Sequence, residues 1–268
     1  MDSTIAQLVS DVKPCAVGVA FRDLVSGATL DIDADRSFHA ASTMKVPVML
    51  EAFRQADQGR FSLDDGLLVR NRFISIADGS TYALDPADDS ETTLYEAIGT
   101  EVPIRALIEP MIAVSSNLAT NILIERLGIE NIQALMSQLQ AEGMKVVRGV
   151  EDKAAYRMGM NNTATPRAFV NLMNHLASRN DPHGVEMIEI MRRQQFNEAI
   201  PSRLPAGCQV AHKTGWNTGV YHDAGWVTGP QGQSFLLAVY TAGSIPKEEA
   251  EVFVAQVASE CYAQAACQ

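Results

Sequence analysis

Apolar residues near both ends of the chain are arranged as in β-strands: they alternate near the N-terminus and form short runs near the C-terminus. In residues 15–24 the apolar positions Val17, Val19 and Phe21 alternate, and a turn leads into a second short segment, so this region predicts a β-hairpin. Three further apolar segments near the C-terminus are bounded by turn residues and predict strands over 208–215, 221–229 and 234–242.

The middle of the chain has the spacing of amphipathic helices instead. A short helix is predicted at the start over 4–11 and a closing helix over about 246–262. Between the strands, helices are predicted over 43–58, 103–114, 118–128, 130–143, 166–178 and 184–196. The stretch 144–165 has neither spacing, and connections of that length are usually functional or disordered.

This order of elements predicts the fold class. We expect an α/β protein of the α+β kind, in which strands from both ends of the chain form one antiparallel sheet flanked by helices, with an inserted all-α lobe. Residues 1–268 would form a single domain, with an α/β lobe of about 1–38 and 200–268 and a helical lobe of about 39–199. A cleft between the lobes is the natural place for a functional site.

Composition and charge exclude several classes of function. The chain has 32 acidic and 21 basic residues, so its net charge of −11 disfavours a nucleic-acid partner, which binds through a surplus of Lys and Arg. A hydrophobic content of 47% with 20% charged residues is typical of a globular protein. No apolar stretch approaches the ~20 residues of a membrane span.

The N-terminus and the cysteines bear on compartment. The first residues lack the uninterrupted apolar core of a signal peptide. We therefore expect a cytoplasmic protein if Met1 is its natural start, or a periplasmic or secreted one if an export signal preceded it. Cys15, Cys208, Cys261 and Cys267 form no close CxxC pair, which predicts no metal site and favours small buried thiols over the alternative of a disulfide.

One short pattern places a hydroxyl near an amine. In the segment FHAASTMKVPVML, Ser42 precedes Lys45 by three residues, just ahead of a helical run. If a helix begins at Ser42, the two side chains share a face, and the helix N-terminus favours developing negative charge. The alternative is an ordinary serine N-cap followed by a surface lysine. A second pair, Ser10 and Lys13, has no supporting residues around it.

Two later groups of polar residues interrupt apolar elements. Ser115 and Asn117 lie at the break between two predicted helices, where they either face a cleft or cap a helix. Lys213, Thr214 and Gly215 end an apolar strand. A lysine and a threonine suit a carboxylate ligand, and glycine allows a substrate backbone to approach, whereas the simpler interpretation is a strand that enters a turn.

Together, and in this order, these groups resemble the S-x-x-K, S-D-N and K-T-G motifs of class A β-lactamases and penicillin-binding proteins. The surrounding segments ASTMKVPVM, MIAVSSNLATN and VAHKTG resemble the family contexts as well, and the resemblance runs from the first strand to the last helix. It implies a monomeric serine hydrolase without metal or cofactor. The substrate it implies is a small molecule, either a β-lactam or an acyl-D-amino-acid-like peptide.

The resemblance also implies roles in acylation. Ser42 is the nucleophile, and Lys45 helps to remove its proton. Ser115 relays a proton to the leaving nitrogen, and Asn117 holds the substrate amide. The backbone amides of Ser42 and Trp216 form the oxyanion hole.

In the same resemblance, Lys213 and Thr214 bind the substrate carboxylate, and Gly215 and Trp216 also belong to the substrate-binding residues. The segment that follows lacks an arginine that many β-lactamases have there. His222 and Arg203 are the candidate substitutes for it.

Two departures from the family pattern bear on mechanism. The second motif has Ser116 where the family usually has an aspartate, which predicts an altered hydrogen-bond network and intact acylation. The long loop offers Glu151 as the base that activates water for deacylation, with Asp152 as an alternative. Four residues after Glu151 stands Ala155, where the family has an asparagine. A solvated acidic pair on a mobile loop is the competing interpretation.

Three functions therefore fit the sequence. The first is a class A-type β-lactamase that acylates on Ser42 and deacylates by water. The second is a D-alanyl peptidase or related amide or ester hydrolase, for which deacylation of β-lactams is slow. The third is a penicillin-binding or sensor domain that is acylated once. The placement of Glu151 distinguishes them, because only a base aimed at the acyl group makes turnover fast.

Overall fold

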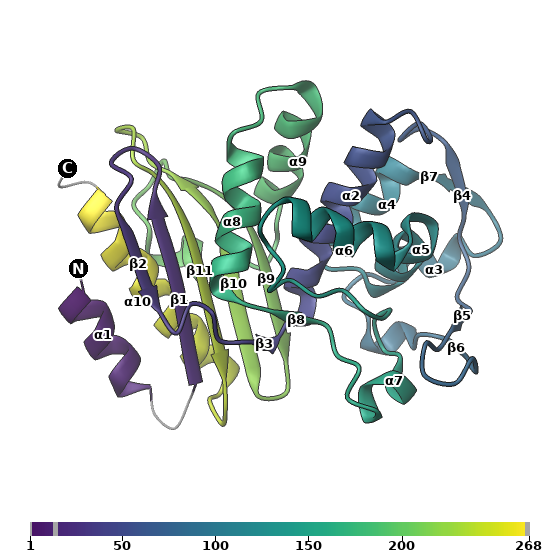
Figure 1. Cartoon of the computed structure of the whole chain (residues 1–268), viewed down its shortest axis with the longest axis horizontal. Helices are drawn as coiled ribbons and strands as arrows, with labels where there is room; N and C mark the ends of the chain where they lie inside the picture. The colour runs from purple at the N-terminus through teal and green to yellow at the C-terminus, as the bar shows by residue number, and fades with distance from the viewer. Residues whose placement is uncertain (1, 13–15, 266–268) are drawn as a thin grey trace.

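Strands from the two ends of the chain form one sheet, as Figure 1 shows. The computed structural model describes residues 2–12 and 16–265. The sheet has five antiparallel strands in the order β2–β1–β11–β10–β9, so the N-terminal hairpin lies beside the three C-terminal strands. The strands are β1 (Ala16–Asp23), β2 (Thr29–Ile32), β9 (Gln209–Asn217), β10 (Val220–Thr228) and β11 (Ser234–Ala242).

The sheet has two apolar faces, because successive apolar side chains of a strand point to opposite sides. On β11, Phe235, Leu237 and Val239 belong to one buried cluster, whereas Leu236 and Tyr240 belong to a second. Successive side chains of a strand point to opposite faces, so each face needs its own cover. A strand that is buried on both faces reads as a continuous apolar run, which is how residues 234–242 read.

Helices cover both faces of the sheet (Figure 1). The two terminal helices, α1 (Asp2–Asp11) and α10 (Lys247–Ala265), pack against each other on one face. The other face is covered by α8 (Pro166–Ala177), which packs against β1, β10 and β11.

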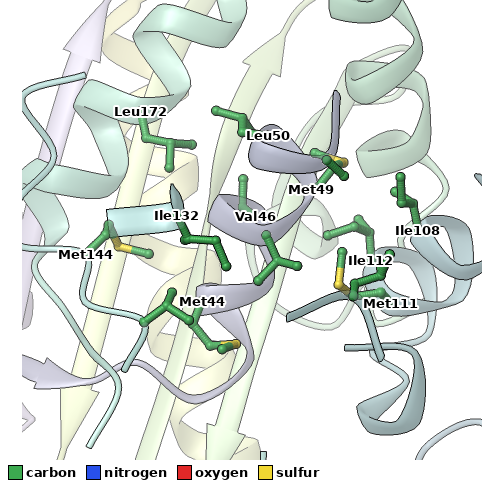
Figure 2. Packing of buried hydrophobic residues seen from close by; sticks show 14 of the residues in the cluster. Met44, Val46, Met49, Leu50, Ile108, Met111, Ile112, Ile132, Met144 and Leu172 are labelled. Carbon is green, nitrogen blue, oxygen red and sulfur yellow. The ribbon is translucent and has the colours of Figure 1, made fainter. Parts of the chain in front are cut away.

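A second group of helices packs beside the sheet, around α2 (Lys45–Asp57). Figure 2 shows the contacts of α2: Val46, Met49 and Leu50 point into a cluster shared with the surrounding helices. The helices that pack on α2 are α4 (Ile104–Ala113), α5 (Asn117–Leu127), α6 (Ile129–Gln138) and α9 (Pro182–Arg192). Pro47 is tolerated because the amides of a first helical turn have no intrahelical partner.

Short elements complete the chain and build the rim of the site. The single-turn helices are η1 (Ala41–Met44), η2 (Pro86–Asp88), α3 (Thr93–Glu96), α7 (Lys153–Arg157) and η3 (Ile200–Arg203). Three two-stranded ladders pair β3 (Phe38–His39) with β8 (Thr163–Ala164), β4 (Gly66–Leu68) with β7 (Glu101–Pro103), and β5 (Phe73–Ile74) with β6 (Thr81–Tyr82).

The predicted fold class is confirmed, with differences in detail. The helix expected from residue 43 begins with the 3-10 turn η1, and α2 starts only at Lys45. Residues 144–165 are not without structure, since they contain α7 and β8. Helix α8 falls within the range predicted for the helical lobe, about 39–199, but it packs on the sheet. The boundaries of the two lobes stay a prediction. Within the described residues, no helix is long and apolar enough to cross a bilayer.

Candidate active site

A pocket of about 630 Å³ opens between the end of β9, the turn η1, the start of α5 and the loop around α7. Seven of the residues singled out in the sequence line it: Ser42, Ser115, Asn117, Glu151, Asp152, Thr214 and Trp216. The two lysines of the first and third motifs are completely buried beside it. Segments that are far apart in the sequence therefore meet at one pocket.

Ser42 lies in η1 and is partly exposed to the pocket. In a 3-10 turn, residues three apart lie on the same side, so Lys45 stays behind Ser42 although no α-helix begins there. The turn is held at Thr43, whose hydroxyl donates to the Ala40 carbonyl over 2.6 Å. From the sheet, the Tyr240 hydroxyl donates to the Thr43 oxygen over 3.0 Å. The nucleophile candidate therefore sits on a rigid, doubly anchored turn.

Strand β9 passes very close to this turn at Gly215. A Cβ atom at position 215 would lie 3.0 Å from the Ser42 nitrogen and 3.1 Å from the Thr43 nitrogen. Only glycine avoids this contact with two backbone atoms, so its role is to let β9 approach the nucleophile turn. Trp216 follows with 57% of its surface exposed at the pocket rim, and the Lys247 ammonium lies 5.2 Å from its ring centre.

Lys45 is buried among polar groups of the second motif. Its Nζ donates to the Ser115 carbonyl at 2.6 Å, to Ser115 Oγ at 3.1 Å and to Asn117 Oδ1 at 2.8 Å. Burial lowers the pKa of Lys45 to about 7, against the opposing charges of Asp89 and Glu151. The three bonds use all three hydrogens of the ammonium form, and the lowered pKa makes it easier for Nζ to give one of them up and then act as a base near neutral pH.

Lys213 reaches the same serine from the other side. Its Nζ donates to Ser115 Oγ at 3.1 Å and to the Thr214 carbonyl at 3.0 Å. Burial, with the nearby charge of Lys45, holds the pKa of Lys213 well below its usual value. Ser115 itself is in the left-handed region with φ 64°, which turns its side chain between the two lysines. With two donors on its oxygen, its own O–H is free for a third group.

Asn117 begins α5 and joins two of the candidates. Its Oδ1 accepts from Lys45, and its Nδ2 donates to Glu151 Oε1 at 3.3 Å. Ser115 and Asn117 line the pocket, and the N-cap of α5 is the residue between them, Ser116, which accepts from the Ala119 amide.

Asp89 is a member of this network that the sequence interpretation missed. It is buried, and its carboxylate accepts from the Asn117 and Leu118 amides. Asp89 lies in a run of polar residues, DDSET, and 28 residues before Asn117. Nothing in that local pattern signals the contact, which exists only because the chain folds back.

Glu151 lies at the pocket with its side chain half-buried and its backbone at φ 61°. Burial and the nearby charge of Asp88 raise its pKa. The preceding loop is fastened by Asn162, whose Oδ1 accepts from the Val147 and Arg148 amides. The missing asparagine four residues after Glu151 does not leave the glutamate loose, since Asn117 contacts it.

Asp152, the alternative base, is occupied elsewhere. Its Oδ1 accepts from the Ser75 hydroxyl at 2.7 Å and from the Ala155 amide at 3.0 Å, and its Oδ2 accepts from the Ile76 amide at 3.0 Å. Asp152 is the N-cap of α7 and ties the loop to residues 75–76. Both carboxylates border the pocket, but they have separate tasks, because the oxygens of Asp152 are already used in the loop anchor.

Neither proposed substitute for the missing arginine reaches the pocket. His222 is fully buried in the sheet, where Nε2 donates to the His39 carbonyl at 2.7 Å and burial lowers its pKa to about 4. Arg203 is exposed in η3, an element that packs against α10 on the far side of the sheet. Arg148 does line the pocket, but its Nε and NH1 donate to the carbonyls of Met160 and Gly149.

The remaining sequence candidates lie away from this pocket. Ser10 is exposed on α1, and Lys13 lies outside the described residues. Cys208 and Cys261 are free thiols, while Cys15 and Cys267 are likewise outside the part that the structure describes. Across residues 2–12 and 16–265, no group of three or more His, Cys, Asp or Glu side chains is arranged to hold a metal ion.

The chain and its fold are similar to those of known proteins. Two curated relatives come from Pseudomonas aeruginosa. The extended-spectrum β-lactamase PER-1 is 24% identical over 93% of this chain and 82% of its own length. The β-lactamase VEB-1 is 25% identical over 91% of this chain and 82% of its own length. The solved structure of PBP-A matches with a TM-score of 0.87 and 29% identity over 100% of this chain and 96% of that one. A β-lactamase from Sphaerobacter thermophilus shares the fold, with a TM-score of 0.83 at 24% identity over 99% and 97%. The model of the β-lactamase enzyme family matches residues 1–265. The chain belongs to the β-lactamase enzyme family.

Proposed function

We propose that this protein opens the cyclic amide of β-lactams through an acyl-enzyme on Ser42. The observation that carries the proposal is the buried Lys45, with a pKa of about 7, one 3-10 turn behind a serine that faces the pocket. A serine hydroxyl is a weak nucleophile until a base takes its proton, and a neutral lysine is such a base.

Acylation would proceed from these positions. Neutral Lys45 takes the proton of the Ser42 hydroxyl as Oγ attacks the β-lactam carbonyl. The backbone amides of Ser42 and Trp216 would stabilise the oxyanion, a kind of contact typically worth about 3 kcal/mol of barrier per donor. The C–N bond then breaks, and the hydroxyl of Ser115 gives its proton to the leaving nitrogen. Both lysines contact that hydroxyl, so either can restore its proton.

Binding of the substrate would use the third motif and Asn117. Thr214 lines the pocket and offers a hydroxyl to the substrate carboxylate, and the negative charge of that carboxylate would favour the charged form of Lys213, which is buried beneath it. The Asn117 side chain would hold the substrate amide, and Gly215 lets β9 lie alongside the substrate. The missing arginine has no replacement in His222 or Arg203, so this carboxylate site depends on Lys213 and Thr214.

Deacylation would depend on Glu151. Its carboxylate lies at the pocket, contacts Asn117 and has a raised pKa, which suits a general base. In our proposal it takes a proton from the water that attacks the acyl carbonyl. That proton passes on to Oγ as the acyl C–Oγ bond breaks, so Ser42 leaves as the hydroxyl. This placement favours turnover over an enzyme that is acylated once. A single-residue variant of PBP-A, the relative at 29% identity, is solved as an acyl-enzyme complex with penicillin G.

We further infer that one chain suffices and that nucleic acid is not a partner. The three motifs of this chain meet at one pocket, and the net charge of −11 opposes phosphate binding.

Incubation with a chromogenic cephalosporin tests the proposal, with turnover and intact protein mass followed together. We expect multiple turnovers and little accumulated adduct. A stoichiometric adduct without turnover would instead support the peptidase-like or sensor function. The absence of both adduct and turnover would refute acylation altogether.

A further inference from the structure

The second motif lacks an acid of its own. Ser116 stands where the family pattern usually has an aspartate, and its side chain only caps the Ala119 amide, at 3.3 Å. Its carbonyl accepts from the Thr120 hydroxyl at 2.6 Å. No carboxylate within the motif itself therefore neutralises the free amides at the start of α5.

Asp89 supplies that carboxylate from a different segment, between η2 and α3. Its Oδ1 and Oδ2 lie 3.0 and 2.9 Å from the Asn117 nitrogen, and Oδ2 lies 2.9 Å from the Leu118 nitrogen. The Tyr95 hydroxyl donates to Oδ2 at 3.0 Å. Asp89 is 9% exposed, so these charge-assisted bonds are shielded from water. A carboxylate at the first helical amides also interacts favourably with the helix dipole.

The amide that Asp89 holds belongs to the residue that joins the two proposed bases. Asn117 binds Lys45 through Oδ1 and Glu151 through Nδ2. We propose that Asp89 is a positioning residue of the active site: by fixing the backbone of Asn117, it holds the side-chain amide between Lys45 and Glu151. It replaces, from a separate loop, the acid that the second motif lacks. The kinetic part of this inference rests on the proposed function.

The charge of Asp89 has a second effect, on Lys45. The charged groups that face Lys45 are Asp89, Glu151 and Lys213, contributed by three different segments. Asp89 and Glu151 raise the pKa of Lys45, while burial lowers it. Removing the Asp89 charge therefore lowers the pKa of Lys45 further, so that the amine stays neutral to lower pH.

Asp89→Asn tests the proposal, with Asp85→Asn as its control. Asp85 is an exposed carboxylate in the same segment, and its Oδ1 accepts from the nearby Ala87 amide. Two properties are measured in each variant: the titration midpoint of Lys45, by NMR of its side chain without substrate, and the pH profile of acylation by a β-lactam. Hydrogen exchange at the Asn117 and Leu118 amides reports the contact itself.

In Asp89→Asn we expect the Lys45 midpoint to fall and the two amides to exchange faster. The acylation rate should drop about ten- to hundredfold, with its acid limb moved to lower pH, since small misplacements of catalytic groups have effects of that size. Asp89→Glu keeps the charge, so it should retain the midpoint while acylation still falls. A purely structural role would change the melting temperature without moving the Lys45 midpoint.

The proposal is wrong if Asp89→Asn and Asp85→Asn agree in midpoint, exchange and acylation. If the wild-type protein is not acylated at all, the proposed function fails, but the titration and exchange measurements still decide the role of Asp89. Should Asp89→Asn not fold, Tyr95→Phe decides: it frees Oδ2, so exchange at Leu118 should quicken and acylation should fall. If Tyr95→Phe shows wild-type hydrogen exchange at Leu118 and a wild-type acylation rate, the proposal is overturned.

Discussion

Replacing Glu151 by glutamine should separate acylation from deacylation. The change keeps the shape of the side chain and an oxygen that can accept from Asn117, whose Nδ2 lies 3.3 Å from Oε1. It removes only the ability to take a proton. Acylation, which we assign to Lys45 and Ser115, should change little, whereas deacylation should slow by about 10²–10⁴-fold, the usual contribution of a general base.

The wild-type pH dependence provides a second test of the same residue. Burial and Asp88 raise the pKa of Glu151 above its usual value of 4.5. Glu151 acts as a base only in its carboxylate form. The deacylation rate should therefore reach its full value above the raised pKa and fall as the pH drops through it. Wild-type deacylation should therefore have an acid limb above pH 4.5, and Glu151→Gln should lack that limb.

Mass spectrometry of the intact protein, combined with stopped-flow turnover of a chromogenic cephalosporin, measures both steps. Glu151→Gln should show a burst of one equivalent and a long-lived adduct of substrate mass. The matched control is Asp152→Asn, in which the neighbouring acid is neutralised. Fast turnover that survives in Glu151→Gln but is lost in Asp152→Asn would refute our assignment and move the base by one residue.

Three further variants test other parts of the site. Lys213→Ala should weaken carboxylate-bearing substrates about tenfold or more while sparing neutral esters, because only the former lose a charge-assisted contact; equal losses in kcat/KM would indicate a structural role. Gly215→Ala places a Cβ 3.0 Å from the Ser42 nitrogen, so acylation should fall about ten- to hundredfold in a protein whose circular dichroism is unchanged; wild-type acylation would contradict this. Asp152→Ala removes the N-cap of α7 and leaves the Ser75 and Ile76 donors without their acceptor, and should lower the free energy of unfolding by roughly 1–3 kcal/mol in denaturant titrations. No loss of stability would mean that the cap is not needed.

The fold and the motif residues were predictable because their signals are local. Strand alternation and helical spacing located the sheet and the longer helices, and strand β11 was predicted to the residue. Ser42, Lys45 and Thr214 were found by residue type, order and flanking sequence. The 3-10 turn was missed, since four residues before a helix give no periodicity of their own.

Contacts between distant segments could not be predicted in this way. Asp89 and Asp152 both lie in polar, irregular stretches, where one acid looks like the next. What distinguishes them is burial against amides 28 and 76 residues away. His222 failed as a carboxylate ligand for the same kind of reason: sheet register, which decides the face of a side chain, turns it toward His39 and away from the pocket.

The identity of the acylated residue can be measured directly. Wild-type protein and Ser42→Ala are incubated with the same β-lactam, at a pH low enough to slow deacylation, and both are examined by intact and peptide mass spectrometry. We expect an adduct on the wild-type peptide that contains Ser42, and neither adduct nor turnover in Ser42→Ala. An adduct of the same mass and yield on Ser42→Ala would contradict the mechanism, because the nucleophile would then lie elsewhere in the chain.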